Sequence, residues 1–280
     1  MKVENLFTVK NKTAVITGGT GVLGRAMAEG LANAGTKVVI IGRKNEIGNA
    51  IVSSLQAQGG EALFVQADVL QVKELEKANE VILGKFGTID ILVNAAGGNL
   101  PGAVITPEQS FFDLNLAEFQ KVVDLNLTGT VLPTKVLCAD MAKRKQGVII
   151  NIASMASYRP ITRVVGYAAS KAAVKNFTEW MAIEMAKKFG EGIRVNAIAP
   201  GYFLTEQNKN LLTNADGSLT ARGESAIKQT PFGRFGAPEE LIGTLLWLCS
   251  DGSKFVTGVT VPVDGGARTA RRSPPRHHGA

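Results

Sequence analysis

The sequence predicts an α/β fold, in which a parallel sheet lies between two layers of helices. Seven short apolar runs rich in β-branched residues recur along the 280 residues, and amphipathic segments separate them. In addition, four glycines within residues 17–24 follow the first run. Strands that are apolar nearly throughout are typical of parallel sheets covered on both faces, and alternation of strand and helix produces such a sheet.

The elements can be taken in chain order. Each apolar run is bounded by glycine or a polar residue and is expected to form a buried strand. These runs are residues 13–18, 37–41, 61–68, 89–97, 147–154, 192–201 and 258–266. Amphipathic segments such as 22–35, 46–60 and 72–87 end in glycine, as helices often do.

The alternation continues without a linker to about residue 266, so residues 1–266 are expected to form a single domain. Within it, residues 202–236 are polar and lack an apolar run. A connection that long inside a compact domain is usually functional, and we expect a substrate lid. Residues 267–280 differ in composition, because they contain both histidines and two of the ten prolines. We expect a disordered basic appendage, or an artefact of cloning or sequencing.

Charge and composition argue against several classes of protein. The last 13 residues hold four arginines and no acid, so the other residues carry 27 basic against 24 acidic side chains, which does not indicate nucleic-acid binding. No apolar run reaches the roughly 18 residues of a membrane span, and residues 1–12 carry charges where a signal peptide is apolar. We therefore expect a cytoplasmic protein. Cys138 and Cys249 lack metal-ligand spacing and are expected to be buried thiols.

The glycines after the first run fit G-x-G-x-x-G, with Gly19, Gly21 and Gly24 at the three glycine positions. The first glycine would permit a tight turn, the second would let the backbone approach a pyrophosphate, and the third would let the helix pack on the strand. Phosphates bind at the N-terminus of such a helix. This motif favours a Rossmann-type, doubly wound fold that binds a dinucleotide, although a purely structural turn is the alternative.

The end of the second run bears on the choice between NAD and NADP. A carboxylate there binds the 2′-hydroxyl of NAD, whereas a basic residue suits the 2′-phosphate of NADP. Gly42 is expected at the strand tip, Arg43 follows it, and no acid occurs before Glu46. NADP is therefore favoured over NAD, with an ordinary solvated loop at Arg43 as the alternative.

A second group of residues indicates catalysis. Ser154 ends the fifth run, and Tyr167 and Lys171 are four residues apart, which places them on one face of a helix. Together with the glycine turn, "NAAG" at 94–97 and "DLNL" containing Asn126, they make the chain resemble the short-chain dehydrogenase/reductase family from about residue 11 to 266. The resemblance implies a seven-stranded sheet, an NAD(P)-dependent oxidoreductase and a homotetramer.

The resemblance also implies a catalytic tetrad of Asn126, Ser154, Tyr167 and Lys171. Tyr167 would exchange a proton with the substrate oxygen, its pKa lowered by Lys171 and by oxidised nicotinamide. Ser154 would donate a hydrogen bond to the same oxygen. Lys171 would also bind the nicotinamide ribose, and Asn126 would position a water that relays protons.

The resemblance also implies which residues contact the cofactor. They are Gly18, Gly19, Thr20, Gly21, Val22, Leu23, Arg43, Asp68, Val69, Asn94, Ala95, Gly97, Tyr167, Lys171, Pro200, Gly201 and Thr205. Two positions depart from the family pattern, because Val22 replaces a glycine of the turn and Ala95 replaces the second asparagine of Asn-Asn-Ala-Gly. The first departure leaves the path of the phosphates open. No metal site is expected.

Several stretches, among them "GYFLTEQN" and "GTLLWL", resemble the D-mannonate oxidoreductases, or fructuronate reductases. The implied substrate is a sugar acid, with Asn99, Arg163 and Gln207 as candidate contacts. Arg163 or Arg159 would pair with its carboxylate, although surface solvation is the alternative. Gluconate 5-dehydrogenase and 3-oxoacyl-carrier-protein reductase are alternative functions within the family. A dinucleotide sensor without catalysis is an alternative of another class.

Overall fold

The computed structural model describes residues 2–205 and 208–270. Its seven strands form one parallel sheet in the order β3-β2-β1-β4-β5-β6-β7. The strands are β1 (Thr13–Thr17), β2 (Lys37–Gly42), β3 (Ala62–Gln66), β4 (Ile91–Asn94), β5 (Gly147–Ile152), β6 (Ile193–Pro200) and β7 (Thr260–Val263). Each falls within an apolar run that the sequence marks as a strand, except that β2 extends one residue beyond its run, so the predicted doubly wound fold is confirmed.

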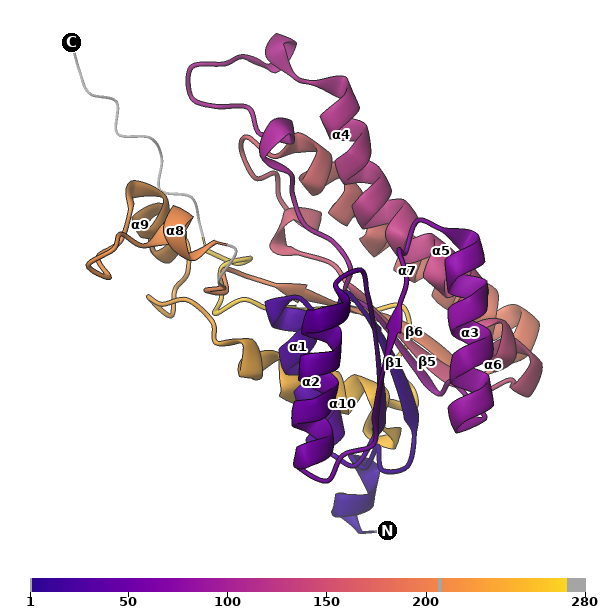
Figure 1. Ribbon diagram of the computed structural model, residues 1–280. Helices are drawn as coiled ribbons and strands as arrows, with labels where there is room; N and C mark the ends of the chain where they lie inside the picture. Colours follow the sequence, from indigo (N-terminus) through magenta and orange to yellow (C-terminus); the bar gives the residue numbers. More distant parts are fainter. Residues whose placement is uncertain (1, 206–207, 271–280) are drawn as a thin grey trace, which may run out of the picture.

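Helices cover both faces of the sheet, on opposite sides in Figure 1. One layer contains α1 (Val22–Asn33), α2 (Asn45–Ala57) and α10 (Ile242–Cys249). The other contains α3 (Val72–Phe86), α4 (Leu116–Val123), α5 (Gly129–Leu137), α6 (Ala139–Arg144) and α7 (Val165–Phe189). No described helix is long and apolar enough to cross a membrane.

Alternate residues of each central strand belong to different cores. Ala14 and Ile16 of β1 pack in the core that includes α1, α2 and α10, whereas Val15 packs in the core that includes α3, α6 and α7. Side chains of a strand point alternately to the two faces of the sheet, so a continuous apolar run serves both layers. The two cysteines are buried and free, as expected.

The two edge strands depart from the sequence-based expectation of buried strands. Only Ala62 of β3 is buried, and all four residues of β7 are partly exposed. An edge strand has a neighbour on one side only, so its side chains have less cover than those of the central strands. Apolar composition alone does not distinguish an edge strand from a central strand.

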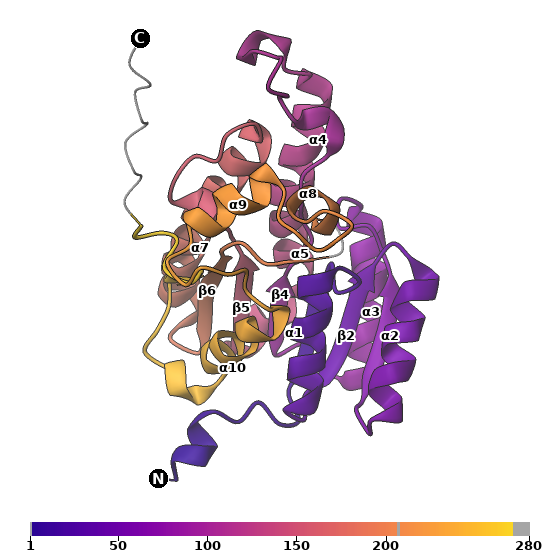
Figure 2. The ribbon, with the colours of Figure 1, turned by 90° about the vertical axis from the view of Figure 1, so that its left-hand side faces the viewer.

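The segment expected to form a lid contains two short helices, α8 (Lys209–Leu212) and α9 (Ala221–Lys228). They lie above the sheet, at the end opposite the N-terminus (Figure 2). Thr213 and Leu219 form an antiparallel bridge between them. A Cβ on Gly223 would lie 2.0 Å from the Leu212 carbonyl oxygen, so glycine permits this close packing.

The chain continues in packed structure beyond the boundary expected at residue 266. Ala267 is fully buried, and the Arg159 guanidinium donates hydrogen bonds to the carbonyls of Ala267 and Ala270. Residues 267–270 are therefore part of the domain, because these contacts hold them against it. The rest of the expected tail, 271–280, lies outside the described residues.

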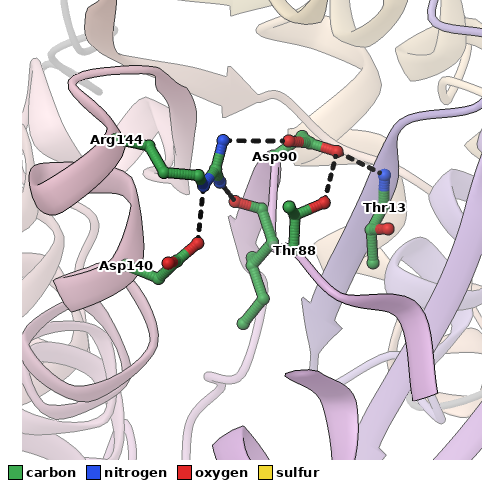
Figure 3. Close-up of polar contacts among 6 residues, drawn as sticks. Thr13, Thr88, Asp90, Asp140 and Arg144 are labelled. Carbon is green, nitrogen blue, oxygen red and sulfur yellow. Dashed lines mark hydrogen bonds and ion pairs between the residues drawn. The ribbon is translucent and has the colours of Figure 1, made fainter. Parts of the chain in front are cut away.

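A polar cluster ties α6 to the amino ends of two strands (Figure 3). The Arg144 guanidinium donates to the Asp140 carboxylate and to the Ile89 carbonyl, both at 2.6 Å. It also lies 3.3 Å from the carboxylate of Asp90, which accepts the backbone N–H of Thr13 at 2.9 Å. The cluster is at the end of the sheet that does not carry the predicted site residues, so its role is structural.

Candidate active site

A cleft of about 760 Å³ lies at the carboxyl ends of the strands. Its walls come from the segments that follow β1, β2, β3, β4, β5 and β6, and from the first turns of α1 and α7. The chain order reverses between β1 and β4, and open α/β sheets bind ligands outside this reversal. The volume suits a large organic ligand.

The glycine turn differs in one detail from its sequence-based interpretation. Gly18, with φ of +66°, adopts the left-handed conformation, whereas Gly19 does not. A Cβ on Gly18 would also lie 2.6 Å from the Ala96 Cα. Gly18 therefore makes the tight turn assigned to Gly19. Gly19 does not line the cleft, and a Cβ on it would lie 3.0 Å from the Ile40 Cγ2.

Helix α1 presents free backbone donors to this cleft. Gly21 is its N-cap residue, no side chain caps the first turn, and that turn contains no acidic residue. A Cβ on Gly24 would lie 2.4 Å from the Gly18 carbonyl oxygen, so only glycine allows the helix to start this close to β1. The unpaired N–H groups and the helix dipole favour a phosphate here. Thr20, Gly21, Val22 and Leu23 all line the cleft.

The other end of the cleft is lined by residues that follow β2 and β3. Gly42, Arg43, Asp68 and Val69 are among them, as is Lys44, which the sequence analysis did not select. The Arg43 side chain is 73% exposed, and its guanidinium lies 3.9 Å from the Asp68 carboxylate. The tip of β2 therefore carries no carboxylate of its own but has two cations next to it.

Asn94 is a second predicted cofactor contact, after Gly19, that the structure places away from the cleft. It does not line the cleft, whereas Ala95, Gly97 and Asn99 after it do. The Asn94 amide donates to Thr134 and to Asn151, which in turn donates to Thr178, each at 2.9 Å. This buried ladder fixes β4 to β5 and to the helices behind them, so Asn94 supports the cleft from below.

Asn126 is completely buried directly behind the cleft wall. Its side chain accepts the Gly98 N–H at 3.0 Å and donates to the carbonyls of Gly98 and Val122 at 2.7 and 2.8 Å. It lies in a single π-helical turn, Asp124–Thr128, between α4 and α5. Such turns are rare and frequent at functional sites.

Ser154, Tyr167 and Lys171 all line the same part of the cleft. The Ser154 hydroxyl oxygen accepts the Ala156 N–H at 3.1 Å, which leaves its proton free to be donated. The Lys171 ammonium donates to the Ile152 carbonyl at 2.7 Å and lies 5.7 Å from the centre of the Tyr167 ring. A Cβ on Gly97 would lie 3.1 Å from that ammonium and 2.7 Å from the Asn126 side-chain oxygen, so the four groups are neighbours.

Burial dominates the ionisation of this group. It lowers the pKa of Lys171 to about 8. It also raises the pKa of Tyr167, although a hydrogen bond with Ser154 acts in the opposite direction. The described side chains therefore do not produce the lowered Tyr167 pKa that the sequence analysis expected from Lys171, because the penalty for a buried phenolate exceeds the effect of the Ser154 bond.

The remaining candidates divide between the cleft and its surroundings. Pro200, Gly201 and Thr205 line the cleft. Arg163 is exposed and does not line the cleft, while Arg159 donates hydrogen bonds to the carbonyls of Ala267 and Ala270. Gln207 lies outside the described residues.

Several lining residues were not selected from the sequence, and three of them lie close together after β6. Tyr202, Phe203 and Asn208 belong to the same loop as Thr205. The Asn208 side chain accepts the Thr205 N–H at 2.7 Å and donates to the Phe203 carbonyl at 2.8 Å. The sequence feature that could have indicated Asn208 is its position three residues after a threonine in a polar loop, because asparagine side chains commonly bond to nearby backbone.

Comparisons with known proteins show that this chain is similar to short chain dehydrogenases. The short chain dehydrogenase family matches residues 12–216. UxuB, an uncharacterised oxidoreductase of Bacillus subtilis, is 51% identical over 272 residues, which cover 94% of this chain and 96% of that protein. A candidate D-mannonate oxidoreductase from Haemophilus influenzae, solved with bound NAD, has a TM-score of 0.89 and 37% identity over 94% of this chain and 97% of its own. A gluconate 5-dehydrogenase from Burkholderia cenocepacia, solved with NADP and tartrate, has a TM-score of 0.85 and 32% identity. The match covers 96% of this chain and 100% of that protein.

Proposed function

Since the chain belongs to the short chain dehydrogenase family and is an NAD(P)-dependent oxidoreductase, we propose that it interconverts D-fructuronate and D-mannonate. The choice of substrate is supported by the similarity to a candidate D-mannonate oxidoreductase, which covers 94% of this chain. A hydroxylated acid also suits the polar groups that Asn99, Tyr202 and Asn208 bring to the cleft.

Tyr167 is the group that exchanges a proton with the substrate oxygen. Ser154 donates its free hydroxyl proton to that oxygen as negative charge develops on it. Lys171 binds the nicotinamide ribose, and Asn126, held by Gly98, positions a water of the proton relay. The nicotinamide supplies or accepts the hydride when bound, and its oxidised form adds the positive charge that a lowered Tyr167 pKa requires.

NADP is the proposed cofactor, in preference to NAD. The support is electrostatic: Arg43 and Lys44 flank the tip of β2, and Gly42 at that tip has no side chain to repel a 2′-phosphate. Replacing Arg43 with Ala should raise the KM for NADPH about tenfold, the loss of one charge-assisted contact. The KM for NADH should change much less. Equal changes in the two KM values would contradict the preference.

The substrate proposal is tested by following the absorbance of reduced nicotinamide with purified protein and D-fructuronate, using NADPH and NADH in parallel. Turnover that disappears in Tyr167→Phe supports both the substrate and the role of the tyrosine. Binding of cofactor without turnover of D-fructuronate would discard the mannonate assignment. 5-Keto-D-gluconate is then the next substrate, because of the likeness to a gluconate 5-dehydrogenase, and a 3-oxoacyl thioester is the third.

The proposed assembly is a homotetramer. Large apolar side chains are exposed on one layer of helices, including Leu116 of α4 and Trp180 and Ile183 of α7, which are 72%, 57% and 57% exposed. Apolar groups of this size are usually covered by a partner. Light scattering coupled to size-exclusion chromatography measures the mass, and a monomer or dimer would contradict the proposal.

A further inference from the structure

One hydroxyl joins the two segments that carry the proposed catalytic groups. Ser157 is the last residue of a one-turn 3-10 helix, Met155–Ser157, which directly follows Ser154. Its Oγ accepts the backbone N–H of Ser154 at 3.3 Å and donates to the backbone carbonyl of Lys171 at 2.7 Å. A serine hydroxyl can do both at once, because it has one proton and two lone pairs.

The bridge connects two elements that are far apart in the chain. Ser154 follows β5, whereas Lys171 lies within helix α7, 14 residues beyond Ser157 in the chain. The second direct tie between these segments is the bond from the Lys171 ammonium to the Ile152 carbonyl. The two bonds hold Lys171 at both its backbone and its side-chain end, so the helix has little freedom to slide or rotate relative to β5.

Ser157 does not line the cleft, so it does not touch a ligand there. Its effect on the reaction has to pass through the residues that it holds. Proton transfer and oxyanion stabilisation depend on geometry, and a displacement of about 1 Å can cost a hundredfold in rate. The Tyr167 ring lies one helical turn before Lys171, so a shift of α7 moves both residues relative to Ser154.

We propose that Ser157 is a positioning residue, which sets the placement of Ser154 relative to Tyr167 and Lys171 through its two hydrogen bonds. The proposal rests on the proposed roles of those three residues. It concerns the chemical step more than cofactor binding, because the phosphates would be held by the glycine turn and the first turn of α1, and the Ser157 hydroxyl bonds to neither.

Ser157→Ala removes the bridge and leaves the rest of the chain intact. The Lys171 carbonyl keeps its place in the helical hydrogen-bond ladder, so the fold should survive. We expect kcat to fall about tenfold with little change in the dissociation constant for NADPH. Ser157→Thr, which restores the hydroxyl, should recover kcat to within about twofold of wild type.

The matched control is Ser170→Ala. Ser170 is also on α7, and its hydroxyl donates to a backbone carbonyl, that of Gly166, at 2.7 Å. This bond stays within the helix and does not reach β5. If Ser157→Ala lowers kcat no more than Ser170→Ala does, at similar losses of thermal stability, the bridge is structural only and the proposal is wrong.

The pH dependence of the reaction distinguishes positioning from a general loss of stability. The hydrogen bond with Ser154 lowers the pKa of Tyr167, so displacement of Ser154 should raise that pKa. In alcohol oxidation the low-pH limb of kcat should therefore move to higher pH in Ser157→Ala and stay in place in Ser170→Ala. Lys171 is the ionisable neighbour of Tyr167 on α7, and the neighbours contributed by β5 and its following turn, the Ile152 carbonyl and Ser154, are uncharged.

Failure of the proposed function can be told apart from failure of this inference. Activity retained in Tyr167→Phe would overturn the residue roles themselves. If D-fructuronate is not turned over, the tyrosinate absorbance provides the comparison, because the chain has only three tyrosines and Tyr167→Phe isolates the signal of one. Tyr167 should then titrate at higher pH in Ser157→Ala than in wild type or Ser170→Ala. Identical titrations in all three would overturn the proposal.

Discussion

Replacement of Lys171 by Met should make the folded protein more stable at neutral pH while abolishing catalysis. Lys171 is only 4% exposed, and burial lowers its pKa from 10.5 to about 8. No carboxylate is among the causes of that shift, so the ammonium is buried without a counter-charge. A methionine side chain of similar length removes the buried charge and keeps the apolar packing of its stem.

The magnitude follows from the pKa shift. A lowering of about 2.5 units corresponds to about 3 kcal/mol by which burial of the ammonium destabilises the folded state at pH 7. The substitution also removes the partner of the Ile152 carbonyl, which costs about 1 to 2 kcal/mol. We therefore expect the free energy of unfolding to rise by about 1 to 2 kcal/mol at pH 7.

The sign of the pH dependence is specific. Because the folded-state pKa of this cation is lowered, its destabilising effect is complete below pH 8 and disappears as pH rises from 8 towards 10.5. Wild type should become relatively more stable over that interval. The variant should lose its advantage there, and it should be the less stable protein near pH 10.5, where only the loss of the Ile152 bond remains.

Urea unfolding at fixed protein concentration, followed by tryptophan fluorescence at several pH values between 7 and 10.5, measures both effects. Lys175→Met is the matched control, because Lys175 lies one turn further along α7 and is 29% exposed in an ion pair with Glu179. It should show no gain at pH 7. A Lys171→Met protein that is less stable at pH 7, by an amount that does not change up to pH 10.5, would refute the reasoning.

Two further substitutions test the cofactor turn and the cluster at the opposite end of the sheet. Gly24→Ala should weaken NADPH binding more than tenfold, because the new Cβ would lie 2.4 Å from the Gly18 carbonyl oxygen and 2.9 Å from the Gly19 Cα, both backbone atoms. Fluorescence titration with NADPH measures this, and an unchanged dissociation constant would contradict it. Arg144→Leu should lower the free energy of unfolding by about 2 to 3 kcal/mol, since it leaves the partly buried Asp90 and Asp140 without their partner. Its dissociation constant for NADPH should stay at the wild-type value, so a large loss of cofactor binding would show that the cluster is not merely structural.

The strands could be predicted because each apolar run is short, β-branched and bounded by polar or glycine residues. The same rule cannot tell a central strand from an edge strand, since neighbours in the sheet are not neighbours in the sequence. Residues 62–66 and 260–263 therefore read as fully buried although each has a partner on one side only. Packing of residues 267–270 was missed for a similar reason, because it depends on Arg159, more than 100 residues earlier.

The candidate site was predictable where its residues share one local motif and less so where they depend on distant contacts. Spacing alone places Tyr167 and Lys171 on one face of α7. Spacing does not reveal that Arg163, four residues before Tyr167, is exposed and does not line the cleft. Arg163 has a φ of +70°. This left-handed conformation is uncommon for a residue other than glycine, so the sequence does not predict it.

The tetrapeptide "DLNL" shows most directly how context assigns a role, since it occurs twice, at 113–116 and 124–127. In the first copy Asn115 is exposed at the start of α4, where its side chain accepts the N–H groups of Ala117 and Glu118 as an N-cap. In the second, Asn126 is fully buried in the π-helical turn. There its side chain bonds to the Gly98 backbone beside the cleft, whereas Asn115 bonds only to the first turn of its own helix. The two roles follow from where each copy lies relative to a helix and to the cleft, which the tetrapeptide itself does not contain.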